Sequence, residues 1–129
     1  MLLDTHVLLW ILMAPERLPD ELAAALADPA HHVMFSAVNI WEIAIKKSLG
    51  RPSFDFGPDE VLRAARATAL VELPVTAEHA ARVTTLEPLH HDPFDRLLLA
   101  QALCEPARLL TADAMLSRYA APVDLMVPQ

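Results

Sequence analysis

Short apolar runs alternate along this chain with longer segments of helical composition, and an acidic residue stands beside four of the runs. The four acidic patches are residues 2–6, 40–44, 92–98 and 109–113. Because strands that alternate with helices favour parallel pairing, the pattern predicts an α/β sandwich around a mainly parallel sheet. A carboxylate beside a buried run loses hydration, so each patch needs a cation or dense hydrogen bonding.

Apolar periodicity, helix caps and breakers set the expected boundaries of the elements. Thr5, Asn39 and Thr76 are the predicted N-caps of three helices. A loop is expected at residues 51–57 and a turn at residues 90–93. We expect strands at residues 1–4, 33–36, 71–73, 108–110 and 123–126. We expect helices at residues 5–13, 19–26, 40–49, 59–70, 76–86, 94–104 and 114–119.

The length and the apolar content indicate one globular domain, residues 1–129, with one core. Hydrophobic residues make up 54% of the chain, above the usual share of about 45–50%. The surplus predicts either a heavily buried core or an apolar surface that a partner covers. One face of a helix cannot bury all four side chains of residues 10–13. This helix is therefore either buried on both sides or covered in part by a partner.

Charge and cysteine content narrow the function classes. The formal net charge of −7 argues against nucleic-acid binding through a broad basic surface. It leaves a nucleic-acid enzyme open, because a divalent cation would neutralise site carboxylates. The single cysteine, Cys104, excludes an intrachain disulfide and a thiolate zinc cluster, and we expect a packed thiol. The longest apolar run, residues 7–14, is shorter than the roughly 20 residues of a membrane span, so a cytoplasmic location is expected.

The four acids are expected to meet at one edge of the sheet. Asp4 and Asp113 fall just beyond the carboxyl ends of predicted strands, where open α/β sheets bind ligands. Glu42 and Asp95 lie in early turns of predicted helices and would face the same crevice. Because carboxylates brought together repel one another, this arrangement predicts a hard-cation site and favours phosphodiester chemistry.

Most of these acids also have an ordinary structural interpretation. Asp92 precedes Pro93 as a helix cap would, and Asp95 stands at the third position of that helix, where an acid favours the helix dipole. Glu42 is either a ligand or the partner of Lys46, four residues on. Asp113 is either a ligand or the cap of the helix that starts at residue 114. Only Asp4 has no local alternative.

Other chemistries find little support in the sequence. The pairs His31-His32 and His90-His91 predict polar loops rather than zinc ligands, because adjacent histidines do not easily point at one ion. His6 is expected either to line the cleft or to be a satisfied core or rim residue. No Gly-x-Ser-x-Gly elbow occurs, and the only glycines, at positions 50 and 57, exclude a glycine-rich phosphate loop.

Taken together in their order, the patches resemble a known family. Residues 2–6 (Leu-Leu-Asp-Thr-His), 36–44, 91–102 and 109–113 (Leu-Leu-Thr-Ala-Asp) resemble the four motifs of PIN-domain ribonucleases of the VapC toxin type. The match runs from residue 2 to about residue 119, in the order and spacing of the family. Each motif alone is weak, whereas the ordered set is highly specific.

The resemblance implies a PIN-like three-layer α/β/α sandwich. It also implies a bound Mg²⁺ or Mn²⁺, cleavage of RNA, a homodimer and inhibition by a cognate antitoxin protein. The implied function is that of a metal-dependent endoribonuclease acting as the toxin of a toxin–antitoxin pair. Two alternatives stay open: a catalytically silent PIN-like module that binds RNA or protein, and a metal-dependent phosphatase or DNA nuclease.

The same resemblance assigns roles to individual residues. Asp4, Glu42 and Asp95 are implied to be the core metal-binding and catalytic acids, and Asp113 completes the set. Asp92 and Thr111 are accessory residues, of which Asp92 is expected to act mainly as a helix cap. Apart from the resemblance, basic side chains near the acids are candidates for phosphate contact. Arg96 and Lys46 are either such contacts or ordinary surface charges, and we expect Lys47 and Arg51 to be surface charges.

Overall fold

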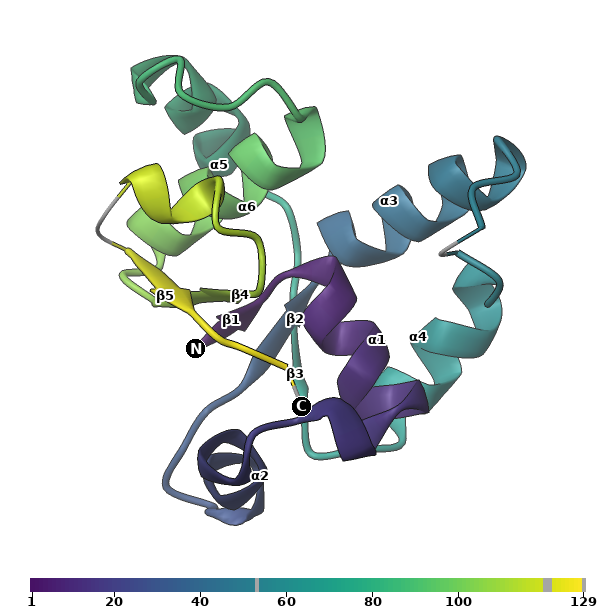
Figure 1. Ribbon diagram of the computed structural model, residues 1–129. Helices are drawn as coiled ribbons and strands as arrows, with labels where there is room; N and C mark the ends of the chain where they lie inside the picture. The colour runs from purple at the N-terminus through teal and green to yellow at the C-terminus, as the bar shows by residue number, and fades with distance from the viewer. Residues whose placement is uncertain (53, 120–121, 129) are drawn as a thin grey trace.

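A single five-stranded parallel sheet forms the centre of the protein (Figure 1). The structure is a computed structural model and describes residues 1–52, 54–119 and 122–128. The strand order is β3-β2-β1-β4-β5, and every neighbouring pair runs parallel. The predicted α/β fold is therefore confirmed. The strands are β1 (Leu2–Leu3), β2 (Met34–Ser36), β3 (Val71–Leu73), β4 (Leu109–Thr111) and β5 (Val123–Leu125).

Helices cover both faces of the sheet (Figure 1). Successive strand residues point to opposite faces, and each face has its own core. Leu3 packs in a cluster with residues of α1 and α4, whereas Leu2 packs in a second cluster with residues of α6. This arrangement is the three-layer α/β/α sandwich. The helices are α1 (Thr5–Met13), α2 (Asp20–Ala27), α3 (Ala37–Ser48), α4 (Pro58–Arg66), α5 (Ala77–Arg82) and α6 (Pro93–Cys104).

Several predicted helix ends were wrong. The helix expected at residues 59–70 ends at Arg66, and the one expected at residues 76–86 gives way to a 3₁₀ turn at Val83–Thr85. That turn contains consecutive β-branched residues, which disfavour an α-helix. Three segments form short 3₁₀ helices, namely Pro15–Arg17, Val83–Thr85 and Leu116–Tyr119, the last of which replaces most of the helix expected at residues 114–119.

Two predicted N-caps are corrected as well. Asp4, not Thr5, caps α1 by accepting a hydrogen bond from the amide of His6 at 3.0 Å. Ser36, not Asn39, caps α3, and the Asn39 side chain instead accepts from the Ser36 amide at 2.7 Å. The reason is that both strands run directly into a helix, so the residue at the end of the strand becomes the cap. The cap predicted at Thr76 is confirmed.

The apolar surplus is divided between the core and the surface. Residues 10–13 are partly buried and pack against the cluster that contains α1 and α4. On α3, in contrast, Trp41 and Ile45 are 47% and 40% exposed, and Leu49, which follows the helix, is 64% exposed. Cys104, expected to be packed, is only half-buried at the end of α6. Among the described residues, every helix is too short or too polar to cross a membrane.

Candidate metal centre

The strand order places two of the predicted acids at the middle of the sheet. From β1 the chain adds β2 and β3 on one side and later β4 and β5 on the other, so the order reverses between β1 and β4. In α/β sheets, ligands bind at the carboxyl ends of the strands beside such a switch point. Asp4 directly follows β1, and Asp113 lies two residues after β4. Both acids therefore border this position.

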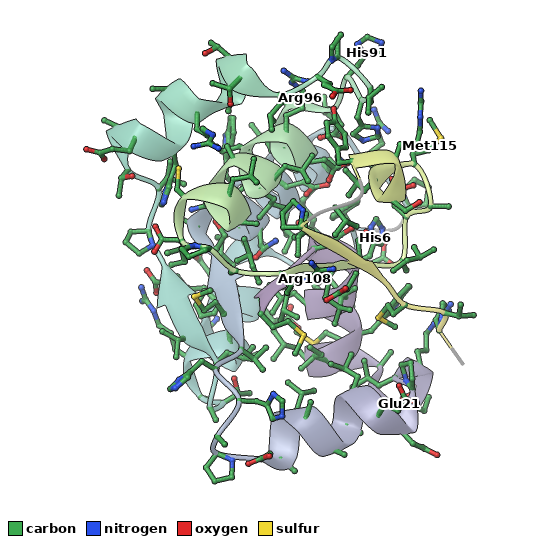
Figure 2. All side chains as sticks on the ribbon, turned by 90° about the vertical axis from the view of Figure 1, so that its left-hand side faces the viewer. His6, Glu21, His91, Arg96, Arg108 and Met115 are labelled. Atoms are coloured by element: carbon green, nitrogen blue, oxygen red, sulfur yellow. The ribbon has the colours of Figure 1, made fainter. Side chains whose placement is uncertain are left out.

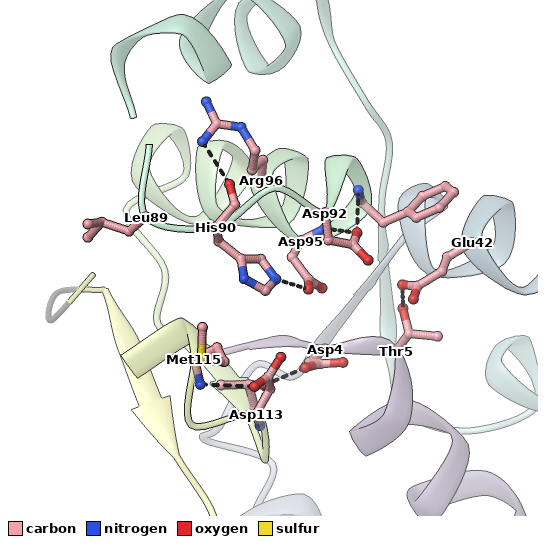
Figure 3. A network of polar contacts seen from close by, with 12 residues as sticks. Asp4, Thr5, Glu42, Leu89, His90, Asp92, Asp95, Arg96, Asp113 and Met115 are labelled. Carbon is pink, nitrogen blue, oxygen red and sulfur yellow. Dashed lines mark hydrogen bonds and ion pairs between the residues drawn. The ribbon is translucent and has the colours of Figure 1, made fainter. Parts of the chain in front are cut away.

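Helices α3 and α6 bring the other acids to the same place. Glu42 lies in the second turn of α3, and Asp95 lies in the first turn of α6. One cavity of about 190 Å³ collects all four predicted acids (Figure 3). Its lining residues are Asp4, His6, Glu42, Lys46, His90, Asp92, Asp95 and Asp113.

Asp4 is the most enclosed of the acids, with 6% of its surface exposed. One carboxylate oxygen accepts the amide of His6, and the other accepts the hydroxyl of Thr111, which is itself fully buried. Burial raises the pKa of Asp4 above its ordinary value, and the nearby charge of Glu42 adds to the increase. Removing this carboxylate from water therefore favours a bound cation or a bound proton.

Glu42 is held by two donors. The hydroxyl of Thr5 donates to Glu42 Oε1 at 2.6 Å, and the ammonium of Lys46 donates to Glu42 Oε2 at 2.5 Å. Asn39 Nδ2 in turn donates to the hydroxyl of Thr5 at 3.0 Å and to the carbonyl of Leu3 at 3.1 Å. The predicted pairing of Glu42 with Lys46 is therefore present, and it lies inside the cavity rather than on an outer face.

Lys46 is a counterion for several acids at once. Burial acts to lower the pKa of Lys46, but the hydrogen bond and charge of Glu42, with the charges of Asp92 and Asp95, raise it above its ordinary value. The ammonium also lies 5.2 Å from the ring centre of Phe54. Lys46 thus stays charged within the acidic cavity.

Asp95 lies close to the imidazole of His90 at the wall of the cavity. His90 Nε2 is 2.7 Å from Asp95 Oδ2 (Figure 3). Burial raises the pKa of Asp95 to about 7, and the charges of Asp4 and Asp92 contribute to the increase. A carboxyl group with such a pKa is only partly ionised at neutral pH unless a cation is bound.

Asp92 and Asp113 combine structural roles with positions on the cavity wall. Asp92 Oδ1 accepts the amides of Phe94 and Asp95 at 2.8 and 3.1 Å, which confirms the predicted helix cap. Its second oxygen lies 3.7 Å from Lys46 Nζ. Asp113 Oδ1 accepts the amide of Met115 at 2.9 Å, so it caps the turn that follows while also lining the cavity.

The other predicted phosphate contact, Arg96, lies outside the cavity lining. Its guanidinium donates to the backbone carbonyls of Val83, Glu87 and His90 at 3.2, 3.4 and 3.3 Å. The structure thus gives Arg96 a different task, which is to hold the loop before α6. Lys47 donates to the carbonyl of Asp55 at 2.5 Å, away from the acids, in line with its expected place on the surface.

Two histidines of the cavity were missed or left open by sequence reasoning. His90 was expected to be a polar loop residue, yet it lines the cavity. The only signal for it was its place two residues before Asp92, next to the acidic patch. His6 follows the cap of α1 and lies at the cavity and beside the ring of Phe54, with ring centres 5.4 Å apart. Of its two predicted alternatives, the structure selects the cleft.

The donor set fits a hard divalent cation. Carboxylate oxygens are the preferred ligands of Mg²⁺ and are well suited to Mn²⁺. Five such groups line one small cavity, and Lys46 is the one permanently charged cation among the described residues that line it. The remaining negative charge is what a divalent ion would neutralise.

Comparison with known proteins agrees with this architecture. The family model described as PIN domain matches residues 1–122, and the chain belongs to this family. A comparison with curated proteins found no match.

Solved structures of similar fold come from three bacteria. VapBC2 from Rickettsia felis, bound to a DNA fragment from its promoter, has a TM-score of 0.68 and 16% identity, over 99% of this chain and 98% of that one. VapBC-1 from nontypeable Haemophilus influenzae has a TM-score of 0.65 and 17% identity, over 98% of this chain and 96% of that chain. A toxin–antitoxin complex from Klebsiella pneumoniae has a TM-score of 0.63 and 19% identity, over 95% of this chain and 94% of that chain. At these identities the likeness establishes the fold.

Proposed function

We propose that this PIN-domain protein is a metal-dependent endoribonuclease that acts as the toxin of a toxin–antitoxin pair. The observation that carries the proposal is the convergence of five carboxylates, among them the four predicted acids, in one cavity at the switch point of the sheet. The similar structures are named as VapBC or toxin–antitoxin complexes, which supports the toxin assignment. The reaction is hydrolysis of an RNA phosphodiester bond.

The metal ligands in this proposal are Asp4, Glu42, Asp95 and Asp113, and the ion is Mg²⁺ or Mn²⁺. When bound, such an ion polarises the phosphate, lowers the pKa of the attacking water and stabilises the leaving oxygen. The protein supplies the orientation of the ligands. Thr111 fixes one oxygen of Asp4, and Thr5 fixes one oxygen of Glu42, so neither carboxylate rotates freely.

Lys46 is the residue that we assign to phosphate contact. In the structure its ammonium pairs with Glu42 and lies 3.7 Å from Asp92. With a divalent ion held by Glu42, that pairing would be weaker, and the Lys46 ammonium would be able to turn toward a phosphate oxygen. Asp92 stays in place as the cap of α6 and as part of the cavity wall.

The proposed partners are a cognate antitoxin and a second copy of the chain, in the cytoplasm. The exposed apolar side chains of α3, together with Leu49 just after it at 64% exposure, provide a surface that either partner would cover. The acidic cavity is open to a cationic side chain, so an inhibitor that presents an arginine there would block it by charge.

The test is cleavage of total RNA by the purified protein with Mg²⁺ or Mn²⁺, read out by sequencing of the newly formed ends. We expect Asp4→Asn and Asp95→Asn to lose cleavage, and we expect the wild type to lose it in excess chelator. The matched control is Asp124→Asn, because Asp124 is a surface acid paired with Arg108 at 2.5 Å. Full cleavage by both site variants would overturn the metal mechanism. Metal binding by the wild type without cleavage of any RNA would instead indicate a catalytically silent module.

A further inference from the structure

We propose that His90 is a nitrogen ligand of the metal in this cavity and that it makes the site prefer a transition-metal ion such as Mn²⁺ over Mg²⁺. The proposal rests on the metal-dependent function proposed above and selects between the two ions. It adds an imidazole to a set of ligands that is otherwise made of carboxylates.

The positions of the ligand atoms support this assignment. His90 Nε2 lies 2.7 Å from Asp95 Oδ2, and the ligand atoms of His90, Asp95 and Asp113 all lie within 4.8 Å of one another. Neighbouring ligands of an octahedral ion with bonds of roughly 2.1 Å are about 3.0 Å apart, and opposite ligands are about 4.2 Å apart. The His90–Asp95 distance is close to that of neighbouring ligands, and the three ligand atoms lie near enough for one ion to reach them once the side chains adjust.

Hydrogen bonds to several backbone carbonyls fix the loop that carries His90. The position of the imidazole at the cavity is therefore set by an ordered backbone. Arg96 donates to the carbonyl of His90 itself at 3.3 Å. Arg118 donates to the carbonyl of Leu89 at 3.2 Å, and the hydroxyl of Tyr119 donates to the carbonyl of Glu87 at 2.8 Å. A ligand whose backbone is held in this way loses little freedom when it binds an ion.

Ligation changes the hydrogen bonding of His90 in a defined way. A neutral imidazole has one N–H and one nitrogen lone pair. In the structure Nε2 faces the Asp95 carboxylate at hydrogen-bond distance. Binding of an ion through Nε2 places the proton on Nδ1, and the ion replaces the proton between Nε2 and Asp95. The contact that now joins the two side chains becomes one edge of the coordination shell.

The chemistry of the donor decides the preference among ions. Mg²⁺ binds oxygen ligands and keeps several waters, whereas imidazole suits first-row transition metals. A site with carboxylates alone would accept both Mg²⁺ and Mn²⁺. A nitrogen donor next to Asp95 and Asp113 adds affinity for Mn²⁺ and adds little for Mg²⁺.

The chain offers matched controls for this assignment. His91, the next residue, is exposed and lies outside the cavity lining, and Figure 2 shows it at the periphery of the molecule. His6 also lines the cavity and is the other histidine there that would place a nitrogen near the ion. Substitution of each residue by glutamine keeps a polar side chain and removes the imidazole nitrogen.

The primary experiment is electron spin-echo spectroscopy of Mn²⁺ bound to the unmutated full chain. A directly bound imidazole gives modulation from ¹⁴N, which changes to the ¹⁵N pattern in protein that contains [¹⁵N]histidine. We expect this modulation in the wild type and in His91→Gln, and its loss in His90→Gln. Calorimetric titration with each ion should show Mn²⁺ affinity lowered roughly 10–100-fold in His90→Gln, with Mg²⁺ affinity changed much less.

Each other outcome separates this inference from the function on which it rests. Bound Mn²⁺ without nitrogen modulation in the wild type would overturn the role of His90 and leave the carboxylate site intact. Modulation that survives in His90→Gln and disappears in His6→Gln would also overturn it. Absence of any Mn²⁺ binding would overturn both proposals. Because the first measurement uses the unmutated chain, it stands even where a variant fails to fold.

Discussion

The hydroxyl of Thr111 donates a hydrogen bond to the buried carboxylate of Asp4, although the two residues are 107 positions apart in the sequence. The same hydroxyl accepts the amide of Asp113 at 3.0 Å. One side chain at the end of β4 thus positions two of the four acids. The contact also ties β4 to the start of α1 across the switch point of the sheet.

Replacing Thr111 tests this link directly. Thr111→Val keeps the shape and removes the hydroxyl, so Asp4 loses one of its two donors. We expect the Mn²⁺ affinity to fall roughly 10–100-fold and the free energy of unfolding to fall by about 1–3 kcal/mol. Calorimetric titration and urea unfolding measure the two effects. Thr111→Ser retains the hydroxyl and should keep most of both quantities, and equal losses in the two variants would contradict the hydrogen-bond explanation.

The raised pKa values of Asp95 and Asp4 make the stability of the metal-free protein depend on pH. Burial raises the pKa of Asp95 from 3.8 to about 7, so the folded state holds a proton that the unfolded state releases at lower pH. The stability from this proton is fully present below pH 3.8 and is lost as the pH rises through about 7. We expect the metal-free protein to melt at a lower temperature at pH 8 than at pH 5. Added Mn²⁺ should raise the melting temperature more at pH 8, because it binds the ionised carboxylate.

The matched variant for this measurement is Asp95→Asn, which cannot ionise. Its melting temperature in the absence of metal should depend less on pH between 5 and 8 than that of the wild type. A wild-type melting temperature that rises over this range, or a fall that is equally large in the variant, would show that other groups dominate the titration.

Lys46 is expected to separate metal binding from catalysis. Lys46→Met keeps the length of the side chain and removes the cation that pairs with Glu42 at 2.5 Å. Because a competing positive charge is lost, Mn²⁺ should bind at least as tightly as in the wild type, while RNA cleavage becomes slower for lack of a phosphate contact. Lys47→Met serves as the control, since Lys47 bonds to the carbonyl of Asp55 instead. Unchanged cleavage in Lys46→Met would remove Lys46 from the proposed site.

Asn39 is expected to be a large contributor to stability. It is fully buried, and its amide bonds to Ser36, Leu3 and Thr5, which connects β1, β2 and the start of α1. Asn39→Ala leaves several of these groups without partners, so the free energy of unfolding should fall by about 2–4 kcal/mol. Urea unfolding measures the change. A surface control, Ser117→Ala, should change it by less than about 0.5 kcal/mol. A loss in Asn39→Ala no greater than in this control would contradict the expectation.

The strand and helix order could be predicted because each local signal agrees with the global fold. Leu2 and Leu3 are fully buried on opposite faces of the sheet, and an apolar dipeptide before an acid indicates such a strand. The caps of α1 and α3 were misplaced because a strand that runs straight into a helix leaves no loop to mark the boundary. Local propensity places a cap at the nearest polar residue, whereas backbone geometry places it at the last residue of the strand.

The site was predictable for the acids and not for the groups that hold them. Asp4 was predicted to have no local structural role, whereas in the structure it also caps α1 by accepting the amide of His6. Thr111 was expected to be an accessory residue only by resemblance, and the roles of Thr5 and His90 depend on contacts between distant segments or on the path of a loop, which no periodicity encodes. Arg96 illustrates the opposite error, because a cation beside an acid suggests a ligand contact, whereas here it binds the carbonyls of its own loop.

The strand order has one more consequence, which concerns translation. The central partner of β1 is β4, and it is made after α6, near the end of the described chain. A nascent chain that stops short of Leu109–Thr111 has no partner for that side of β1, no hydroxyl to hold Asp4 and no Asp113. A product terminated before β4 would therefore lack several groups of the proposed site, and we expect it to leave the RNA of its own cell intact.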